Sequence, residues 1–143
     1  MDHKNTVKKI MVFGVFDRLH PGHCSFLEQA GRCGTELVAV ITRDAMVYEL
    51  KKKTPTHTET IRMQAVQNVS PVHQAVLGDE MLGSYDVIRT YKPDIICLGY
   101  DQHGLREDLR FRMDQGELAP VEIAVMKPHE AHRFHTSLLT DAK

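Results

Sequence analysis

The sequence has no excess of charge of either sign. Its 18 Lys and Arg residues balance 19 Asp and Glu residues, which gives a formal net charge of -1. Nucleic-acid-binding domains and polybasic membrane-surface segments carry clustered positive charge, so we expect no nucleic-acid partner. Apolar runs are short and broken by charges, far from the roughly 20 residues that a membrane-spanning helix needs. We therefore expect no membrane partner either.

Cysteine is scarce and has neither a metal-binding nor a disulfide pattern. The three residues, Cys24, Cys33 and Cys97, are odd in number and include no C-x-x-C pair. We expect reduced thiols, which are typical of a cytoplasmic protein. The first nine residues, MDHKNTVKK, lack the apolar core of a signal peptide and favour the same location.

Internal repeats, low-complexity stretches and linkers are also missing, which favours a single domain over residues 1–143. Short apolar runs alternate with segments of helical periodicity. The runs predict five strands, over residues 8–16, 36–42, 73–78, 94–100 and 121–126. Strands that are apolar along their whole length are typical of a parallel sheet covered on both faces. We therefore expect an α/β fold, a Rossmann-like doubly wound parallel sheet of about five strands with helices on both faces.

Helices are predicted between these strands. Pro21 suits the first turn of a helix over residues 21–33, because its missing N–H has no partner there. Thr56 and Glu59 have the spacing of a capping box and predict the start of another helix. The other helical segments are a polar loop or short helix over 42–55, a helix over 85–92 capped by Ser84, an exposed helix over 106–116, and a short last helix from Thr136 or Ser137.

In sheets of this kind, ligands bind beyond the carboxyl ends of the strands. Four segments follow predicted strand ends, over residues 15–23, 43–55, 99–104 and 127–137. They are the segments richest in His, Lys, Arg and Asp. We therefore expect the functional site where these four segments meet.

The first of these segments, GVFDRLHPGH over residues 14–23, predicts a phosphate site. His20 and His23 stand on either side of Pro21 and Gly22 at a helix N-terminus, where free N–H groups and the helix dipole favour an anion. Imidazole donors can strengthen their bonds as negative charge grows in a transition state. The motifs G-x-G-x-x-G and G-x-x-x-x-G-K-[ST] are absent, which disfavours a dinucleotide-dependent dehydrogenase and leaves this turn as the principal phosphate site.

The same residues carry a family resemblance. GVFDRLHPGH resembles the G-[TV]-F-D-x-x-H-x-G-H signature of the cytidylyltransferase-like nucleotidyltransferases, and the resemblance extends over nearly the whole chain. KPDIICLGYDQ, residues 92–102, is especially similar to the archaeal FAD synthases of this superfamily. The resemblance implies transfer of AMP from ATP to a phosphate acceptor, FMN, to give FAD and pyrophosphate. Two alternatives stay open: a cytidylyltransferase acting on glycerol 3-phosphate or another sugar or polyol phosphate, and a nucleotide-binding module without catalysis.

The resemblance also implies roles for particular residues. His20 and His23 hold the α-phosphate, and Arg62 braces the phosphates. One lysine of the run Lys51, Lys52 and Lys53 contacts the triphosphate, with Lys53 as the candidate. The implied catalytic residues are His20, His23, Arg62 and Lys53, and the implied nucleotide-binding residues are Val15, Phe16, His20, Pro21, Gly22, His23, Asp101, Arg133, Thr136 and Ser137.

Other implied features concern the turn, the metal and the assembly. Asp17 is expected to brace the turn rather than to act in catalysis. His129, His132 and His135 recur at every third residue, but the segment is not H-E-x-x-H, and we expect no protein-bound metal. Mg²⁺ or another divalent cation is expected to arrive with ATP and to bind through its phosphates. Relatives of this family are often dimers, so a homodimer is implied.

Overall fold

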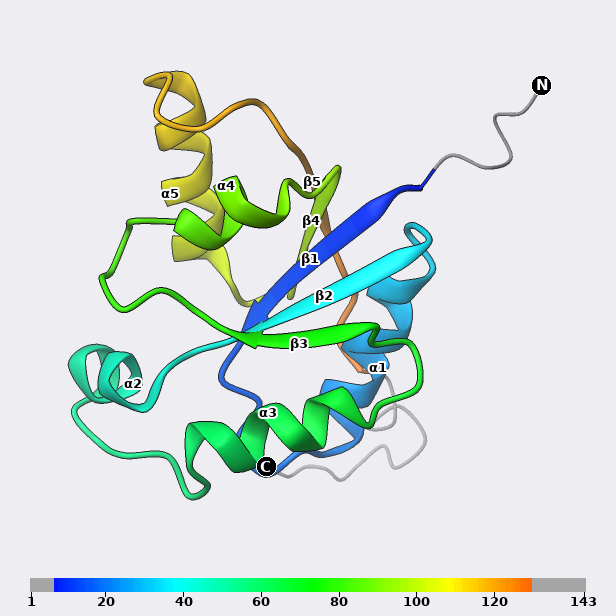
Figure 1. Cartoon of the computed structure of the whole chain (residues 1–143), viewed down its shortest axis with the longest axis vertical. Coiled ribbons are helices and arrows are strands. Elements are labelled where there is room, and N and C mark those ends of the chain that lie inside the picture. The colour runs from blue at the N-terminus through cyan, green and yellow to red at the C-terminus, as the bar shows by residue number, and fades with distance from the viewer. Residues whose placement is uncertain (1–6, 130–143) are drawn as a thin grey trace, which may run out of the picture.

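Five strands form one parallel sheet in the order β3-β2-β1-β4-β5 (Figure 1). The structure is a computed structural model, and it describes residues 7–129. The parallel sheet confirms the predicted α/β fold. The strands are β1 (Lys9–Gly14), β2 (Glu36–Ile41), β3 (Gln74–Leu77), β4 (Ile95–Leu98) and β5 (Glu122–Val125).

Helices cover both faces of the sheet, as predicted. The helices α1 (Pro21–Gly31) and α3 (Glu59–Gln67) pack on one face, and α4 (Asp86–Tyr91) and α5 (His103–Asp114) pack on the other (Figure 1). Alternation along β1 explains this arrangement, because successive side chains of a strand point to opposite faces. Ile10 and Val12 belong to the apolar cluster beneath α1 and α3, whereas Met11 belongs to the cluster beneath α4 and α5.

The segment after β2 forms a short helix, α2 (Asp44–Lys51), which settles the choice between loop and helix left open by the sequence. It lies beyond the carboxyl end of β2 rather than over the middle of the sheet (Figure 1). Val47 is the buried residue of this helix. The position brings the lysines at its end to the edge of the sheet where ligands are expected.

The predicted capping box of α3 is wrong. The N-cap is Thr58, whose hydroxyl accepts from the Ile61 N–H at 3.4 Å. The Thr56 N–H instead donates to a carboxylate oxygen of Asp17, and the Glu59 carboxylate accepts from the N–H of residue 44. Partners from distant segments have therefore taken the groups that a local cap would use.

Two further helix starts differ from the prediction. Ser84 does not cap α4: the N-cap is Tyr85, with a left-handed φ of 52°, and the Ser84 hydroxyl donates to the Met81 carbonyl. The last helix, α5, begins at His103 rather than at residue 106. The predicted short helix from Thr136 or Ser137 lies outside the described residues, and the single domain over 1–143 stays a prediction.

The strands β1 and β4 mark the point where the strand order reverses. Along its full length β1 pairs with β2, but it pairs with β4 only at Ile10 and Met11. Toward their carboxyl ends the two strands are bridged by the side chain of Gln102, which donates to the Phe13 carbonyl at 3.0 Å and accepts from the Gly99 N–H at 2.8 Å. Within residues 7–129 no helix has the length and apolar character to cross a bilayer.

Candidate active site

A cavity of about 820 Å³ opens at the carboxyl ends of β1 and β4. Its size falls in the range typical of small-molecule sites. The walls come from residues within four segments, 13–26, 47–56, 99–102 and 127–129. The structure therefore brings together the first three of the segments that follow the predicted strand ends and the described part, residues 127–129, of the fourth.

The turn between β1 and α1 has a backbone shape that depends on its residue types. Phe16 and Arg18 both have φ of 53°, in the left-handed region. The ring of Phe16 is buried and folds back over Gly14, where a Cβ atom would lie 2.7 Å from the ring carbon Cε2. Glycine at position 14 is therefore required by the path of the turn.

His20 and His23 cap the start of α1 with their rings. The Nδ1 atom of His20 accepts from the Gly22 N–H at 3.1 Å, and the Nδ1 atom of His23 accepts from the His20 N–H at 3.2 Å. A Cβ atom on Gly22 would lie 2.9 Å from Cε1 of His20, so glycine leaves the space that this ring occupies. Because each Nδ1 accepts, each neutral ring carries its proton on Nε2, which can donate to a ligand in the cavity that both residues line.

The two imidazoles lie against each other, with ring centroids 3.7 Å apart and planes 23° apart. Burial and, to a smaller extent, the neighbouring His20 together lower the pKa of His23 to about 4, against the opposing effect of Asp17. At neutral pH, His23 is therefore uncharged. It can serve a phosphate as a hydrogen-bond donor, not as a cation.

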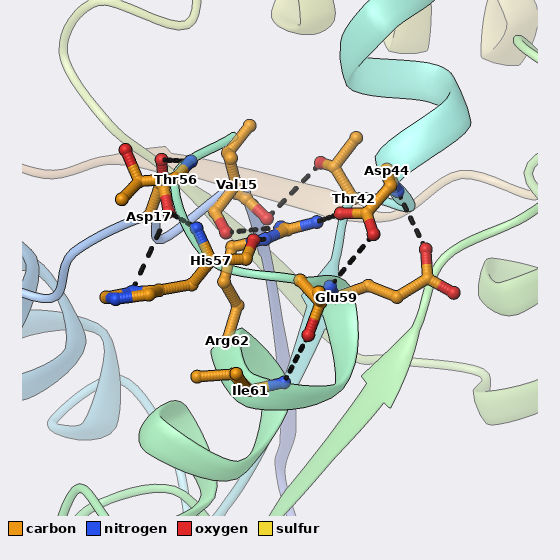
Figure 2. A network of polar contacts seen from close by, with 11 residues as sticks. Val15, Asp17, Thr42, Asp44, Thr56, His57, Glu59, Ile61 and Arg62 are labelled. Carbon is orange, nitrogen blue, oxygen red and sulfur yellow. Dashed lines mark hydrogen bonds and ion pairs between the residues drawn. The ribbon is translucent and has the colours of Figure 1, made fainter. Parts of the chain in front are cut away.

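Asp17 connects the turn to the loop between α2 and α3, which agrees with the bracing role expected for it. Its carboxylate accepts from the Thr56 N–H at 2.6 Å and from the His57 N–H at 2.9 Å (Figure 2). Burial alone would raise the pKa of the Asp17 carboxyl, but the two backbone hydrogen bonds hold this pKa below its usual value. Both carboxylate oxygens are thus engaged in holding the loop.

The three consecutive lysines differ in position. Lys51 and Lys53 line the cavity. Lys52 ends α2 in a left-handed conformation with φ of 59° and is not part of the lining. The predicted candidate Lys53 and its neighbour Lys51 therefore face the site, from the wall formed by residues 47–56.

Arg62 lies in the interior and is not part of the cavity lining. Its side chain is buried, with 1% of the residue exposed. The guanidinium donates to the Val15 carbonyl at 2.7 Å, the His57 carbonyl at 3.0 Å and the Asp44 carboxylate at 2.6 Å (Figure 2). Its predicted contact with phosphate stays a prediction, and the observed contacts join loops that line the cavity.

Several cavity residues, among them Lys127 and His129, had no role assigned from the sequence. The contacts of Gln29, which lies outside the lining, explain how these two residues reach the cavity. Its side chain donates to the Lys127 carbonyl and accepts from the Lys127 N–H, both at 2.9 Å, and so holds the chain after β5 beside α1. This contact spans 98 residues, and no local pattern signals it. It brings Lys127 and His129 to the cavity wall. Tyr100 and Gln102, also in the wall, fall inside the predicted segment 99–104.

The remaining predicted residues are divided between the lining and the undescribed part of the chain. Val15, Phe16, Gly22 and Asp101 line the cavity, whereas Pro21, the first residue of α1, is described but is not part of the lining. Arg133, Thr136 and Ser137 lie outside the described residues, as do His132 and His135. In the part of the chain that the structure describes, no group of three His, Cys, Asp or Glu side chains is arranged to hold a metal ion.

Residues 11–138 match the model of the Cytidylyltransferase-like family. The chain belongs to this family. Within the family it is similar to curated archaeal FAD synthases. It is 49% identical to the FAD synthase of Aciduliprofundum boonei over 96 residues, and 40% identical to that of Ferroglobus placidus over 119 residues. These alignments cover 66% and 80% of this chain, and 62% and 76% of the two relatives, so the chain spans slightly less than two thirds of the first.

Solved structures are similar to this chain in fold. A crystal structure described as the lipopolysaccharide core biosynthesis protein of Thermoplasma volcanium is 31% identical, with a TM-score of 0.78, and the match covers 87% of this chain and 99% of that one. The pantoate-beta-alanine ligase of Francisella tularensis shares the fold, with a TM-score of 0.60 and 11% identity over 96% of this chain and 67% of its own. The expected superfamily and the resemblance to FAD synthases are confirmed.

Proposed function

We propose that the chain is an FMN adenylyltransferase, which transfers AMP from ATP to FMN to give FAD and pyrophosphate. The observation that carries the proposal is the stacked pair of His20 and His23 at the N-terminus of α1, with both Nε2 donors available to a cavity that Lys51 and Lys53 also line. The similarity to proteins named FAD synthase supports ATP and FMN as the substrates.

The reaction is a substitution at the α-phosphorus of ATP. An oxygen of the FMN phosphate forms a bond to the α-phosphorus, while the bond from that phosphorus to the bridging oxygen of the β-phosphate breaks. The electron pair of the broken bond leaves with pyrophosphate. Because the attacking phosphate is already an anion, no base has to remove a proton, and catalysis consists of positioning and charge stabilisation.

The described residues supply both contributions. The Nε2–H groups of His20 and His23 donate to the α-phosphate oxygens, whose charge increases in the five-coordinate transition state. The ammonium groups of Lys51 and Lys53 offset the charge that builds up on the departing pyrophosphate. The backbone near Val15 and the side chain of Asp101 line the nucleotide side of the cavity.

A divalent cation fits this donor set when phosphate oxygens supply most of its ligands. Both oxygens of Asp17 accept backbone N–H groups, which leaves Asp101 as the other carboxylate of the described lining. Since Asp101 is proposed to contact the nucleoside, Mg²⁺ bound to ATP would be held by phosphate oxygens and water, and it would neutralise phosphate charge. Arg133, Thr136 and Ser137 are proposed as further phosphate contacts from the resemblance. A cytoplasmic location and a homodimer stay predictions.

The test is a comparison of nucleotide and acceptor pairs with the purified full chain. ATP with FMN should give equal amounts of FAD and pyrophosphate, while CTP with glycerol 3-phosphate should give no turnover above background. The reverse result would replace the proposal with a cytidylyltransferase. Binding of ATP without turnover of any phosphate acceptor would indicate a nucleotide-binding module.

Asparagine variants separate the donor role of the histidines from their capping role. An asparagine carbonyl can still accept the backbone N–H that Nδ1 accepts, but it cannot replace the Nε2 donor. His20→Asn and His23→Asn should each lower kcat by on the order of 10²–10³-fold. His103→Asn is the matched control, since His103 is an exposed histidine at a helix start that does not line the cavity. Equal rates for all three variants would contradict the role of the pair.

A further inference from the structure

The two site-facing lysines stand on an excursion of the chain whose ends lie close together. This lysine segment, residues 44–57, leaves β2 through α2 and returns at the loop before α3. Lys51 and Lys53 lie near its middle, and both line the cavity. This segment has no strand pairing of its own, so its position depends on the packing of the buried Val47 and on the contacts that hold its two ends.

Arg62 holds both ends of the lysine segment. It donates to the Asp44 carboxylate at 2.6 Å at one end and to the His57 carbonyl at 3.0 Å at the other. A third bond, at 2.7 Å, goes to the carbonyl of Val15 in the turn that carries the two histidines (Figure 2). One guanidinium therefore fixes the lysine segment against the histidine turn.

Other hydrogen bonds around Arg62 also hold the ends of the lysine segment. The N–H of Asp44 donates to the Glu59 carboxylate at 2.7 Å, and the N–H of Glu59 donates to the Asp44 carboxylate at 3.2 Å. Each carboxylate therefore accepts from the first N–H of the helix that carries the other. Asp17 holds the N–H groups of Thr56 and His57 (Figure 2). Among these contacts only Arg62 connects all three parts: the start of α2, the loop before α3 and the histidine turn.

Burial makes this role specific to arginine. Of the residues that the structure describes, Arg62 is the charged one that is buried, and its side chain has no exposed surface. A buried charge is tolerated where a partner charge and hydrogen bonds satisfy it. Lysine would keep the charge, but it lacks the planar fork that donates in three fixed directions.

We propose that Arg62 is a positioning residue that places Lys51 and Lys53 opposite His20 and His23, rather than a phosphate ligand. The inference rests on the proposed nucleotidyl transfer, in which the histidines and lysines hold parts of one triphosphate. Loss of this placement should reduce the rate strongly, because a displacement of about 1 Å at a site of this kind can cost on the order of 10²-fold.

A substrate-free measurement tests the placement. Amide hydrogen exchange at Thr56 and His57 should become at least about tenfold faster in Arg62→Lys and in Asp44→Asn, because the segment loses a fixed end. Arg112→Lys is the matched control, since Arg112 also bonds several partners, Asp108 and Glu117, but does not line the cavity. Unchanged exchange in both test variants would overturn the proposal. If Arg62→Lys does not fold, Asp44→Asn decides the question.

A double-mutant cycle then distinguishes placement from direct phosphate contact. Arg62→Lys should lower kcat/KM for ATP on the order of 10²-fold in the otherwise wild-type chain, but less than about threefold in a Lys51→Ala, Lys53→Ala background. Equal losses in the two backgrounds would show that Arg62 does not act through the lysines and would overturn the proposal. Wild-type kcat/KM in Arg62→Lys would overturn it as well. If the wild-type chain makes no FAD, the proposed function fails, while the exchange measurement still decides the role of Arg62.

Discussion

An imidazole can serve a phosphate as a cation or as a neutral donor, and the surroundings of His23 favour the neutral form. Its Nδ1 already accepts a backbone N–H, and a second imidazole lies 3.7 Å away, centroid to centroid. Protonation would remove the acceptor, place two rings that can carry charge side by side, and charge a half-buried group. The neutral ring keeps its Nε2 donor at any pH near neutrality.

The low pKa of His23 should be visible in both titration and stability. The pKa is about 4 in the folded chain against an ordinary value of 6.5, so between these pH values the unfolded chain binds a proton that the folded chain does not. The free energy of unfolding should therefore decrease as pH decreases through this window. In His23→Asn the decrease over the same window should be smaller, because the titrating group is absent. Denaturant unfolding at pH 7 and pH 4.5 measures the difference. An NMR titration of the His23 Cε1 proton with a midpoint near 6.5 would contradict the assignment.

Residue roles could be predicted where chemistry and geometry come from adjacent positions. The ten residues GVFDRLHPGH contain the strand end, the turn glycine, the first helical proline and both histidines, so their sequence alone indicated a phosphate site. Arg62 differs, because two of its partners, Val15 and Asp44, are 47 and 18 residues away. Nothing in the neighbouring sequence distinguishes an arginine that faces a ligand from one that faces inward.

At the scale of elements, strands were easier to predict than helix starts. All five strands form where apolar runs occur. The inner strands β1, β2 and β4 are largely buried, and the edge strands β3 and β5 are only partly buried. The start of a helix depends on which group satisfies its first N–H groups. Thr56 and Ser84 have suitable side chains, but the N-caps are Thr58 for α3 and Tyr85 for α4. The backbone N–H of Thr56 bonds to Asp17, and the hydroxyl of Ser84 bonds to the Met81 carbonyl.

Gln29 gives a prediction at this scale, because it attaches the chain after β5 to α1. Gln29→Leu keeps a similar volume but removes both bonds to Lys127, and these bonds lie at an exposed position where water can replace them. We therefore expect the free energy of unfolding to change by less than about 1 kcal/mol. The KM for ATP should rise several-fold, because Lys127 and His129 lose their fixed place in the cavity wall.

The control for this variant is Gln67, the last residue of α3. Gln67 bridges α3 to the chain at β3 in the same manner, donating to the His73 carbonyl and accepting from the Ala75 N–H. It does not line the cavity. Gln67→Leu should therefore leave the KM for ATP unchanged, as measured by steady-state kinetics. An equal rise in both variants would show that the effect is not specific to the chain after β5.

At the scale of the whole molecule, stability and activity are located in different parts of the fold. Two apolar clusters lie on the two faces of the sheet and supply most of the buried surface. The cavity lies at the carboxyl edge and is built from loops that join these elements. Phe16 belongs both to the cavity lining and to one of the apolar clusters. The polar loop residues contribute little apolar burial, so their substitutions should affect ligand handling more than folding, whereas core substitutions should do the opposite.

Leu109→Ala and Lys53→Ala test this separation as a pair. Leu109 is fully buried in the cluster beneath α4 and α5, and its truncation should lower the free energy of unfolding by about 2–5 kcal/mol. At a temperature where the variant is folded, kcat/KM should stay within about twofold of wild type, because no cavity residue changes.

Lys53→Ala should change stability by less than about 0.5 kcal/mol. ATP at a fixed concentration should stabilise Leu109→Ala as much as wild type, and Lys53→Ala less, because linkage depends only on affinity. Thermal unfolding with and without ATP measures both effects, and a loss of ATP stabilisation in Leu109→Ala would show that core and cavity are coupled.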